Sequence, residues 1–143
     1  MDQLIEFASI NALLVGGTVL MAISVLIYEL RQRAQSVFEV TPVQAVQLIN
    51  RQGARVLDIR DQDKFSGGHI AGALNLPGGK IGDAQGKKLK KNKPVVVVCD
   101  NGISSSRCVE PLRKEGFEST FSLQGGLGAW QRDNLPLVNG KSS

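Results

Sequence analysis

The chain has 143 residues, with 17 Lys and Arg against 13 Asp and Glu. This length suffices for one domain of ordinary size and a short additional segment. The 2 cysteines cannot form a disulfide framework, so free thiols and a reducing compartment are expected. Aromatic residues are sparse and the sequence carries no motif typical of RNA or DNA binding, so a nucleic-acid partner is not expected.

The first predicted element is an uncharged run of 22 residues, 7–28. As a helix it is about 33 Å long, which matches the roughly 30 Å hydrocarbon core of a bilayer. We therefore predict a short N-terminus (1–6), one transmembrane helix (7–28) and a polar juxtamembrane linker (29–37), with a continuation of the helix into the linker as an alternative. A secretory signal peptide, which has a basic start and a shorter apolar core, is the first alternative. A buried core helix is the second.

Charges at the two ends of this run predict its orientation. Asp2 and Glu6 precede the run, whereas Arg31 and Arg33 follow it. The positive-inside rule places the two arginines in the cytoplasm. We expect a single-pass protein of the inner (plasma) membrane, with the lipid bilayer as a partner, its N-terminus outside and residues 31–143 cytoplasmic.

From residue 38 onward, apolar segments that are typical of strands alternate with helical ones. Thr41-Pro42 is a preferred helix start, and four consecutive valines are typical of a parallel strand buried on both faces. We predict strands at 38–40, 55–60, 74–77 and 94–98, and at 120–123. We predict helices at 42–52, 61–65, 104–115 and 125–130, and a less regular one at 80–91. This alternation predicts one α/β domain with a parallel sheet over residues 38–140.

Much of the excess positive charge lies in a lysine-rich segment before the valine strand, at positions 87, 88, 90, 91 and 93. A solvated face is the ordinary interpretation of such a run. Attraction to anionic lipid headgroups is the alternative.

A cysteine follows the valine strand directly, and a loop of small and polar residues, 100–106, follows the cysteine. A ligand site is expected at the carboxyl end of a parallel strand. Loop N–H groups and the N-terminus of a helix that begins near Ser104 favour an anion there, and therefore a thiolate. The alternative is that Cys99 is only a small buried hydrophobe at the end of a strand.

Several motifs in this order resemble the rhodanese family of single-domain sulfurtransferases. They are 56–60 (Val-Leu-Asp-Ile-Arg), 68–73 with 75–77, 97–102, 116–117, and 125–126 with 129–130. With the predicted anchor, the chain is similar to bacterial membrane-anchored rhodanese-like proteins. The resemblance implies a five-strand parallel sheet flanked by helices. It also implies that the cysteine accepts a sulfane sulfur as a persulfide and passes it to a nucleophilic acceptor.

The site residues follow from the same resemblance. Cys99 is the catalytic residue, and Arg60 is a candidate either for lining the pocket or for bracing the fold through an ion pair. The persulfide loop consists of Asp100, Asn101, Gly102, Ile103, Ser104 and Ser105. The loop N–H groups are expected to converge on the anionic sulfur. The expected partners are a small sulfur donor or a persulfidated protein, and a thiol or other nucleophilic acceptor; neither a metal nor a cofactor is expected.

The loop departs from the usual family pattern, Cys-x-x-Gly-x-Arg-Ser. Ser104 occupies the Arg position, while Ser105 keeps the Ser. The loop therefore lacks a cation for an anionic donor such as thiosulfate, and a donor other than thiosulfate is expected. Asp100 is expected to raise the pKa of the neighbouring thiol, and Arg60 and Arg107 are candidate replacements for the missing cation.

Two other functions are alternatives to a sulfurtransferase. A cysteine phosphatase needs the pattern Cys-x5-Arg, but Ser105 stands at the Arg position, so this class is disfavoured. A weakly active or non-catalytic interaction module, tethered at the membrane to a protein partner, remains the alternative to a sulfurtransferase.

Three further residues receive structural interpretations. His69, the single histidine, is predicted to hold a turn, and Asp58 to brace the backbone. Cys108 is predicted to be a small buried hydrophobe rather than a resolving thiol, and too far from Cys99 to attack a persulfide there.

Overall fold

The computed structural model describes residues 2–36, 38–80 and 89–140. The chain divides into two compact units, Met1–Val37 and Phe38–Ser143. Most of the helix predicted at 80–91 lies outside the described residues.

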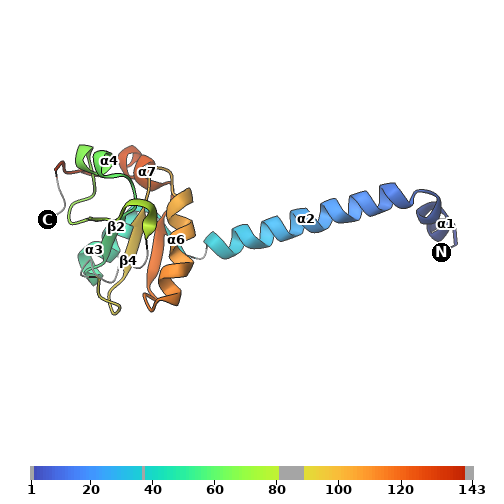
Figure 1. Cartoon of the computed structure of the whole chain (residues 1–143), viewed down its shortest axis with the longest axis horizontal. Coiled ribbons are helices and arrows are strands. Elements are labelled where there is room, and N and C mark those ends of the chain that lie inside the picture. Colours follow the sequence, from blue (N-terminus) through green and yellow to red (C-terminus); the bar gives the residue numbers. More distant parts are fainter. Residues whose placement is uncertain (1, 37, 81–88, 141–143) are drawn as a thin grey trace. The chain divides into compact units, whose positions relative to one another are not determined.

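The first unit consists of two helices, α1 (Asp2–Ile10) and α2 (Ala12–Ser36), which meet at Asn11 (Figure 1). The single helix predicted at 7–28 is therefore interrupted, and it extends through the predicted linker 29–37 as far as Ser36. At the interruption, the Asn11 side-chain amide donates to the Phe7 carbonyl (3.1 Å), which the Asn11 backbone N–H also uses (3.0 Å). Such competition for a carbonyl weakens helices locally. Residues 29–36, which form this extension, are mostly Glu, Leu, Arg, Gln and Ala, and these residues have high helix propensity.

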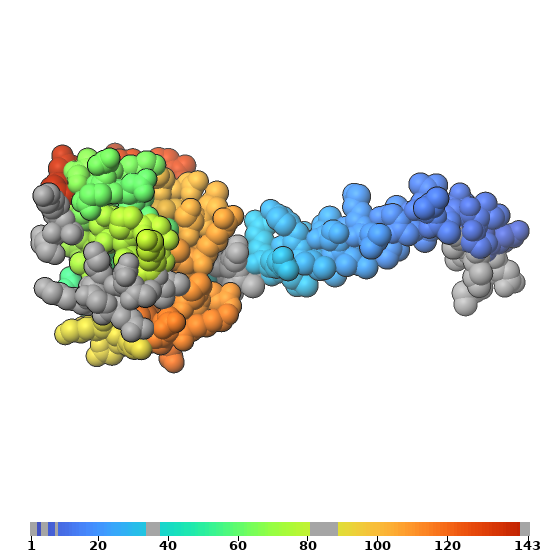
Figure 2. Space-filling view, viewed as in Figure 1, coloured from blue at the N-terminus to red at the C-terminus, as the bar shows by residue number. Residues whose placement is uncertain are grey.

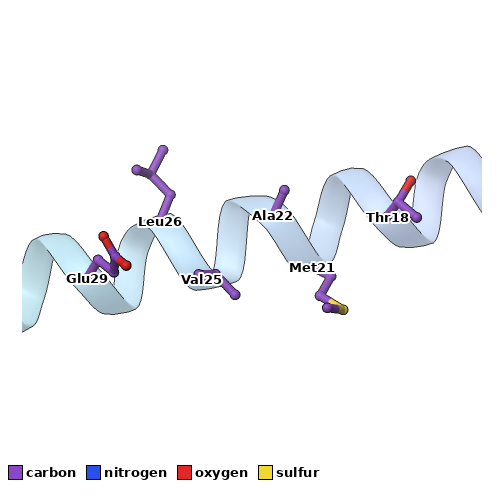
Figure 3. A pocket seen from close by; sticks show the side chains of 6 residues that line it. All are labelled: Thr18, Met21, Ala22, Val25, Leu26 and Glu29. Atoms are coloured by element: carbon purple, nitrogen blue, oxygen red, sulfur yellow. The ribbon is translucent and has the colours of Figure 1, made fainter.

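Within α2, the segment Ala12–Arg33 is long and apolar enough to cross a membrane, with a mean hydropathy of 2.1. None of its most apolar stretch is buried within the protein, and Figure 2 shows the atoms of α2 as a narrow rod. Figure 3 shows side chains that line a shallow groove along α2: Thr18, Met21, Ala22, Val25, Leu26 and Glu29. The groove is mostly apolar. The side chains that line it include no thiol and no cation, so we do not consider it a candidate active site.

The second unit contains a five-strand parallel sheet in the order β1-β5-β4-β2-β3. The strands are β1 (Glu39–Val40), β2 (Arg55–Asp58), β3 (Leu74–Asn75), β4 (Val95–Val98) and β5 (Thr120–Leu123). The predicted five-strand parallel α/β architecture is thereby confirmed. The valine strand β4 lies at the centre of the sheet, and β3 lies at one edge. A short 3-10 helix, η1 (Pro77–Gly79), begins two residues after β3.

The helices of this unit are α3 (Pro42–Gln52), α4 (Gln62–Gly67), α6 (Ile103–Lys114) and α7 (Gly126–Arg132). Helix α3 begins with a capping box, in which Gln44 N–H donates to Thr41 Oγ1 (3.3 Å) and Thr41 N–H donates to Gln44 Oε1 (2.9 Å). It ends at Gly53, whose φ of 63° suits glycine. The predicted start and end of α3 are therefore confirmed.

The valines of β4 face two different halves of the core. Val96 and Val98 pack in a cluster with residues of α3, α4 and α7, including Trp130. Val95 and Val97 pack in a second cluster with Leu112 of α6 and neighbouring residues. Figure 1 shows α3 and α6 on opposite sides of the sheet. Burial on both faces holds β4 firmly, and with it the residue that follows the strand.

Candidate active site

Cys99 directly follows β4, at the carboxyl end of the central strand, and is only 5% exposed. The start of α7 lies against this turn, since Leu127 N–H donates to the Cys99 carbonyl (2.9 Å) and Gly128 N–H to the Asp100 carbonyl (3.1 Å). A Cβ at Gly126 would collide with the Cys99 carbonyl oxygen. The glycine therefore allows the close approach of two backbones that holds the cysteine in place.

Hydrogen-bond donors converge on the sulfur of Cys99. Gly102 N–H lies 3.0 Å and Ser105 N–H 3.4 Å from Sγ, and the thiol in turn donates to Ser105 Oγ, 3.4 Å away. Gly102 has a φ of 89°, which turns the chain back over the sulfur and which glycine adopts without a Cβ penalty. The loop thus forms a small anion-binding concavity around the thiol.

Two opposing effects set the pKa of Cys99. Burial raises it, because a thiolate loses hydration. Hydrogen bonds from the Ser105 side chain and from the backbone of Ser105, Asn101 and Gly102 lower it, and together they outweigh burial, so the pKa lies below its ordinary value. The loop therefore increases the share of nucleophilic thiolate at neutral pH.

The start of α6 differs in detail from the prediction. The helix begins at Ile103 rather than near Ser104, with Gly102 at the N-cap position and no side-chain cap from that residue. Asn101 supplies an acceptor instead, since Ile103 N–H donates to Asn101 Oδ1 (3.1 Å). Ile103 and Ser104 are both exposed, so they lie at the surface of the loop and not beneath the sulfur.

Arg60 both braces the fold and faces the site. Its guanidinium donates to both carboxylate oxygens of Asp58 (Nε–Oδ1 3.0 Å, Nη2–Oδ2 2.7 Å) and to the Gly68 carbonyl (2.7 Å). Asp58 is almost fully buried, so this ion pair is screened little by solvent. The predicted bracing role of Asp58 agrees with these contacts.

The carboxylate of Asp100 pairs with cations. It lies 2.7 Å from Lys64 Nζ and 3.7 Å from Arg60 Nη1. The pKa of Cys99 shifts downward and Asp100 is not among the main causes of the shift, so the expectation that Asp100 raises this pKa is not met. Sequence reasoning missed Lys64, because only the placement of α4 brings it next to the loop.

A cavity of about 520 Å³ opens in front of the sulfur. It is lined by Ile59, Arg60, Asp61, Lys64, Gly78, Cys99, Asp100, Asn101, Ser104, Arg107 and Cys108. Most of the residues predicted for the site therefore meet at one cavity. Gly102 and Ser105 are the buried support of the thiol, and Ile103 points outward.

Cys108 lines the same cavity as Cys99, which corrects the expectation that α6 carries it well away from the site. Its side chain is half-buried and packs beside the cluster that contains Leu112. Burial raises the pKa of Cys108, and the nearby charge of Cys99 raises it further. At neutral pH, Cys108 is thus a protonated packing group, which agrees with the predicted small hydrophobe.

Hydroxyl groups behind the loop form a network that sequence reasoning did not find. Ser105 Oγ lies 2.8 Å from Ser122 Oγ of β5, which lies 3.2 Å from Ser106 Oγ, and Ser106 Oγ donates to Glu39 Oε1 of β1 (3.0 Å). The network fixes the rotamer of Ser105, and it does so through strands distant in sequence. The single hint in the sequence is a polar residue at 122 within an apolar strand.

His69 has structural contacts that satisfy it. Its Nδ1 lies 2.8 Å from the Phe65 carbonyl oxygen, its ring stacks on the Phe65 ring at 3.8 Å, and its backbone pairs with Val138. These contacts agree with the predicted role of holding a turn.

Residues 41–133 match the sequence profile of the Rhodanese-like domain. The chain belongs to the rhodanese-like family. It is 34% identical over 143 residues to the Escherichia coli (strain K12) protein YibN, a match that covers 99% of this chain and 100% of YibN. It is 38% identical over 91 residues to the thiosulfate sulfurtransferase GlpE of Shewanella oneidensis, covering 64% of this chain and 89% of GlpE.

Among solved structures, the Rhodanese-like domain of the Anabaena sp. protein Alr3790 superimposes with a TM-score of 0.63 at 28% identity, covering 71% of this chain and 79% of that domain. The predicted resemblance to rhodanese sulfurtransferases is thereby confirmed. The family and its sulfurtransferase relatives support an enzyme of this class.

Proposed function

We propose that this protein is a membrane-anchored rhodanese-like sulfurtransferase that carries sulfane sulfur as a persulfide on Cys99. The observation that carries the proposal is the convergence of the Gly102 and Ser105 N–H groups on Cys99 Sγ. These donors stabilise a negative sulfur. Because the pKa of Cys99 is lowered, more of the thiol is present as nucleophilic thiolate, and the cavity gives a sulfur donor access to this thiolate.

The proposed reaction has two half-reactions at one sulfur atom. The Cys99 thiolate attacks the sulfane sulfur of a donor and forms an S–S bond with it. The bond between that sulfur and the rest of the donor breaks, and the rest of the donor leaves with the electron pair of this bond. The negative charge then lies on the outer sulfur of the persulfide. A nucleophilic acceptor attacks this outer sulfur, and the S–S bond breaks to return the Cys99 thiolate.

The test is detection of the carrier form. Purified protein is exposed in turn to thiosulfate, mercaptopyruvate and a loaded cysteine desulfurase, and intact mass is measured before and after addition of a thiol acceptor. We expect a gain of one sulfur atom that peptide mapping assigns to Cys99 and that the acceptor removes. Absence of this gain with every donor would contradict the proposal.

The second candidate is a weakly active or non-catalytic interaction module held at the membrane. Ser104 favours it, because the loop lacks the cation of the usual family pattern. The same mass measurement separates the two functions, since a non-catalytic module gains no sulfur from any donor.

We further propose that α2 anchors the protein in the inner membrane, with residues 38–140 as a cytoplasmic domain. Two hydroxyls in the middle of α2 bond to the helix itself. Thr18 Oγ1 donates to the carbonyl of Val15 (2.9 Å), and Ser24 Oγ donates to that of Leu20 (2.8 Å). Such internal bonding suits a lipid environment, where water is absent. The match to YibN also extends over the N-terminal segment.

Fractionation and labelling test this topology. We expect the full chain in the membrane fraction, released by detergent and not by high salt. A membrane-impermeant thiol reagent should label Cys99 in lysed cells and not in intact ones. Labelling of Cys99 in intact cells would contradict the proposed orientation. Recovery of the full-length protein in the soluble fraction would contradict the proposed membrane anchor.

A further inference from the structure

The cations that line the cavity differ in how strongly they are already engaged. Arg60 is held by Asp58 and the Gly68 carbonyl, and Lys64 pairs with Asp100 at 2.7 Å. Arg107 lines the same cavity, and its side chain has neither a hydrogen bond nor an ion pair among the residues that the structure describes. Its guanidinium is therefore available to an incoming anion.

The position of Arg107 on α6 places it beside the loop. Ser104, Arg107 and Cys108 are spaced as i, i+3 and i+4 on the helix, and all three line the cavity. Arg107 is thus one turn further along the same helix face from Ser104. The side chain of Arg107 is long and exposed, whereas Cys99 in the same lining is only 5% exposed.

The charges around the cavity favour an anion at this end. Its lining carries three cations, Arg60, Lys64 and Arg107, and two carboxylates, Asp61 and Asp100. Since Arg60 is paired with Asp58 and Lys64 with Asp100, Arg107 is the cation of this lining that no ion pair neutralises among the described residues. A planar guanidinium that has no partner is well suited to bind an oxyanion through two parallel hydrogen bonds.

We propose that Arg107 binds the anionic group of a small sulfur donor and so replaces the cation that the loop lacks at Ser104. The ligand class is an oxyanion attached to a sulfane sulfur, as in thiosulfate. The sulfane sulfur then points to Cys99, and the oxyanion leaves from the side of Arg107. This assignment deepens the proposed sulfurtransferase function and rests on it for the identity of the donor.

A matched pair of alkylating reagents tests the cation without sulfur chemistry. Iodoacetate is anionic and iodoacetamide is neutral, while both react with the same thiolate. The ratio of their rate constants at Cys99, followed by peptide mass spectrometry of the full chain in detergent, reports the local positive charge. Arg107→Gln should lower this ratio about fivefold, as expected for the loss of one partly screened charge.

Lys114→Gln is the matched control, because it removes one positive charge from the same helix at a residue that pairs with Glu110 away from the cavity. It should leave the ratio unchanged, and Arg107→Lys should restore most of the effect. An equal ratio in wild type and Arg107→Gln, with both proteins folded, would overturn the proposal.

A second measurement addresses the donor. The thiosulfate concentration that gives half-maximal Cys99 persulfide formation should rise about fivefold in Arg107→Gln, in line with the alkylation ratio. If the alkylation ratio falls but no donor forms a persulfide on the wild type, Arg107 binds anions and the proposed sulfurtransferase function fails. If thiosulfate forms a persulfide equally well in both proteins, the sulfurtransferase function stands and Arg107 is not its donor site.

Discussion

Two thiols nine residues apart line one cavity, yet their surroundings push their pKa values in opposite directions. Cys99 lies at the end of a strand, where the first N–H groups of α6 lack helical partners and are free to bond a sulfur. Cys108 lies inside α6, where the backbone N–H groups are consumed by the helix itself. Burial therefore dominates at Cys108 and raises its pKa, whereas donors outweigh burial at Cys99. Free backbone donors, rather than exposure, distinguish the nucleophile from the packing group.

Replacing the proposed nucleophile should give the largest effect. Cys99→Ser leaves the loop and its donors in place but removes the sulfur that carries the persulfide. We expect sulfur transfer to fall below detection with every donor, while thermal unfolding stays close to wild type. Persulfide found on Cys108 in this variant would show that the second thiol is also a carrier.

Adding a cation to the loop should give the next largest effect. Ser104→Arg restores the usual family pattern and places a guanidinium at an exposed position of the cavity lining. Turnover of thiosulfate should rise about tenfold, which corresponds to roughly 1.4 kcal/mol of transition-state stabilisation. A neutral Ser104→Gln variant serves as the control and should show no increase. Equal turnover in both variants would mean that charge at this position does not limit the reaction.

Removing one donor to the sulfur should give a smaller effect. Ser105→Ala deletes the hydroxyl 3.4 Å from Cys99 Sγ, and this hydrogen bond is one cause of the lowered pKa. Its loss should raise the pKa of Cys99, so the thiolate fraction at neutral pH falls. The rate of Cys99 alkylation by iodoacetamide at neutral pH should drop about threefold, as for one modest hydrogen bond. The midpoint of the pH profile of Cys99 alkylation should move to higher pH. An unchanged midpoint would mean that the Ser105 hydroxyl contributes to packing alone.

Changing the second thiol should have the smallest effect. Cys108→Ala keeps a small apolar side chain beside Leu112, so sulfur transfer should stay within about twofold of wild type. In the wild type, Cys108 should also alkylate more slowly than Cys99 at neutral pH, because its pKa is raised and less thiolate is present. A loss of transfer much larger than twofold would make Cys108 a participant in the reaction.

Local signals in the sequence were sufficient for the elements of the fold. The apolar run before Tyr28, the capping pair Thr41-Pro42 and the four valines 95–98 act through hydropathy, capping and burial, which depend on near neighbours in the chain. They predicted the apolar N-terminal helix, the start of α3 and the central strand. Several boundaries shifted, among them one at Asn11, where a side chain competes for a backbone carbonyl, and one at Ile103, whose N–H Asn101 caps.

The sequence by itself therefore determined the family, the five-strand parallel sheet and the thiol at the end of its central strand, because these follow from ordered motifs and from period and burial along the chain. The tertiary structure alone decided which charges meet that thiol. Lys64 and Arg107 come from two different helices, and Ser122 and Glu39 from two different strands, yet all contribute to one site. Their distances depend on how the helices pack against the sheet, and no local pattern encodes that packing.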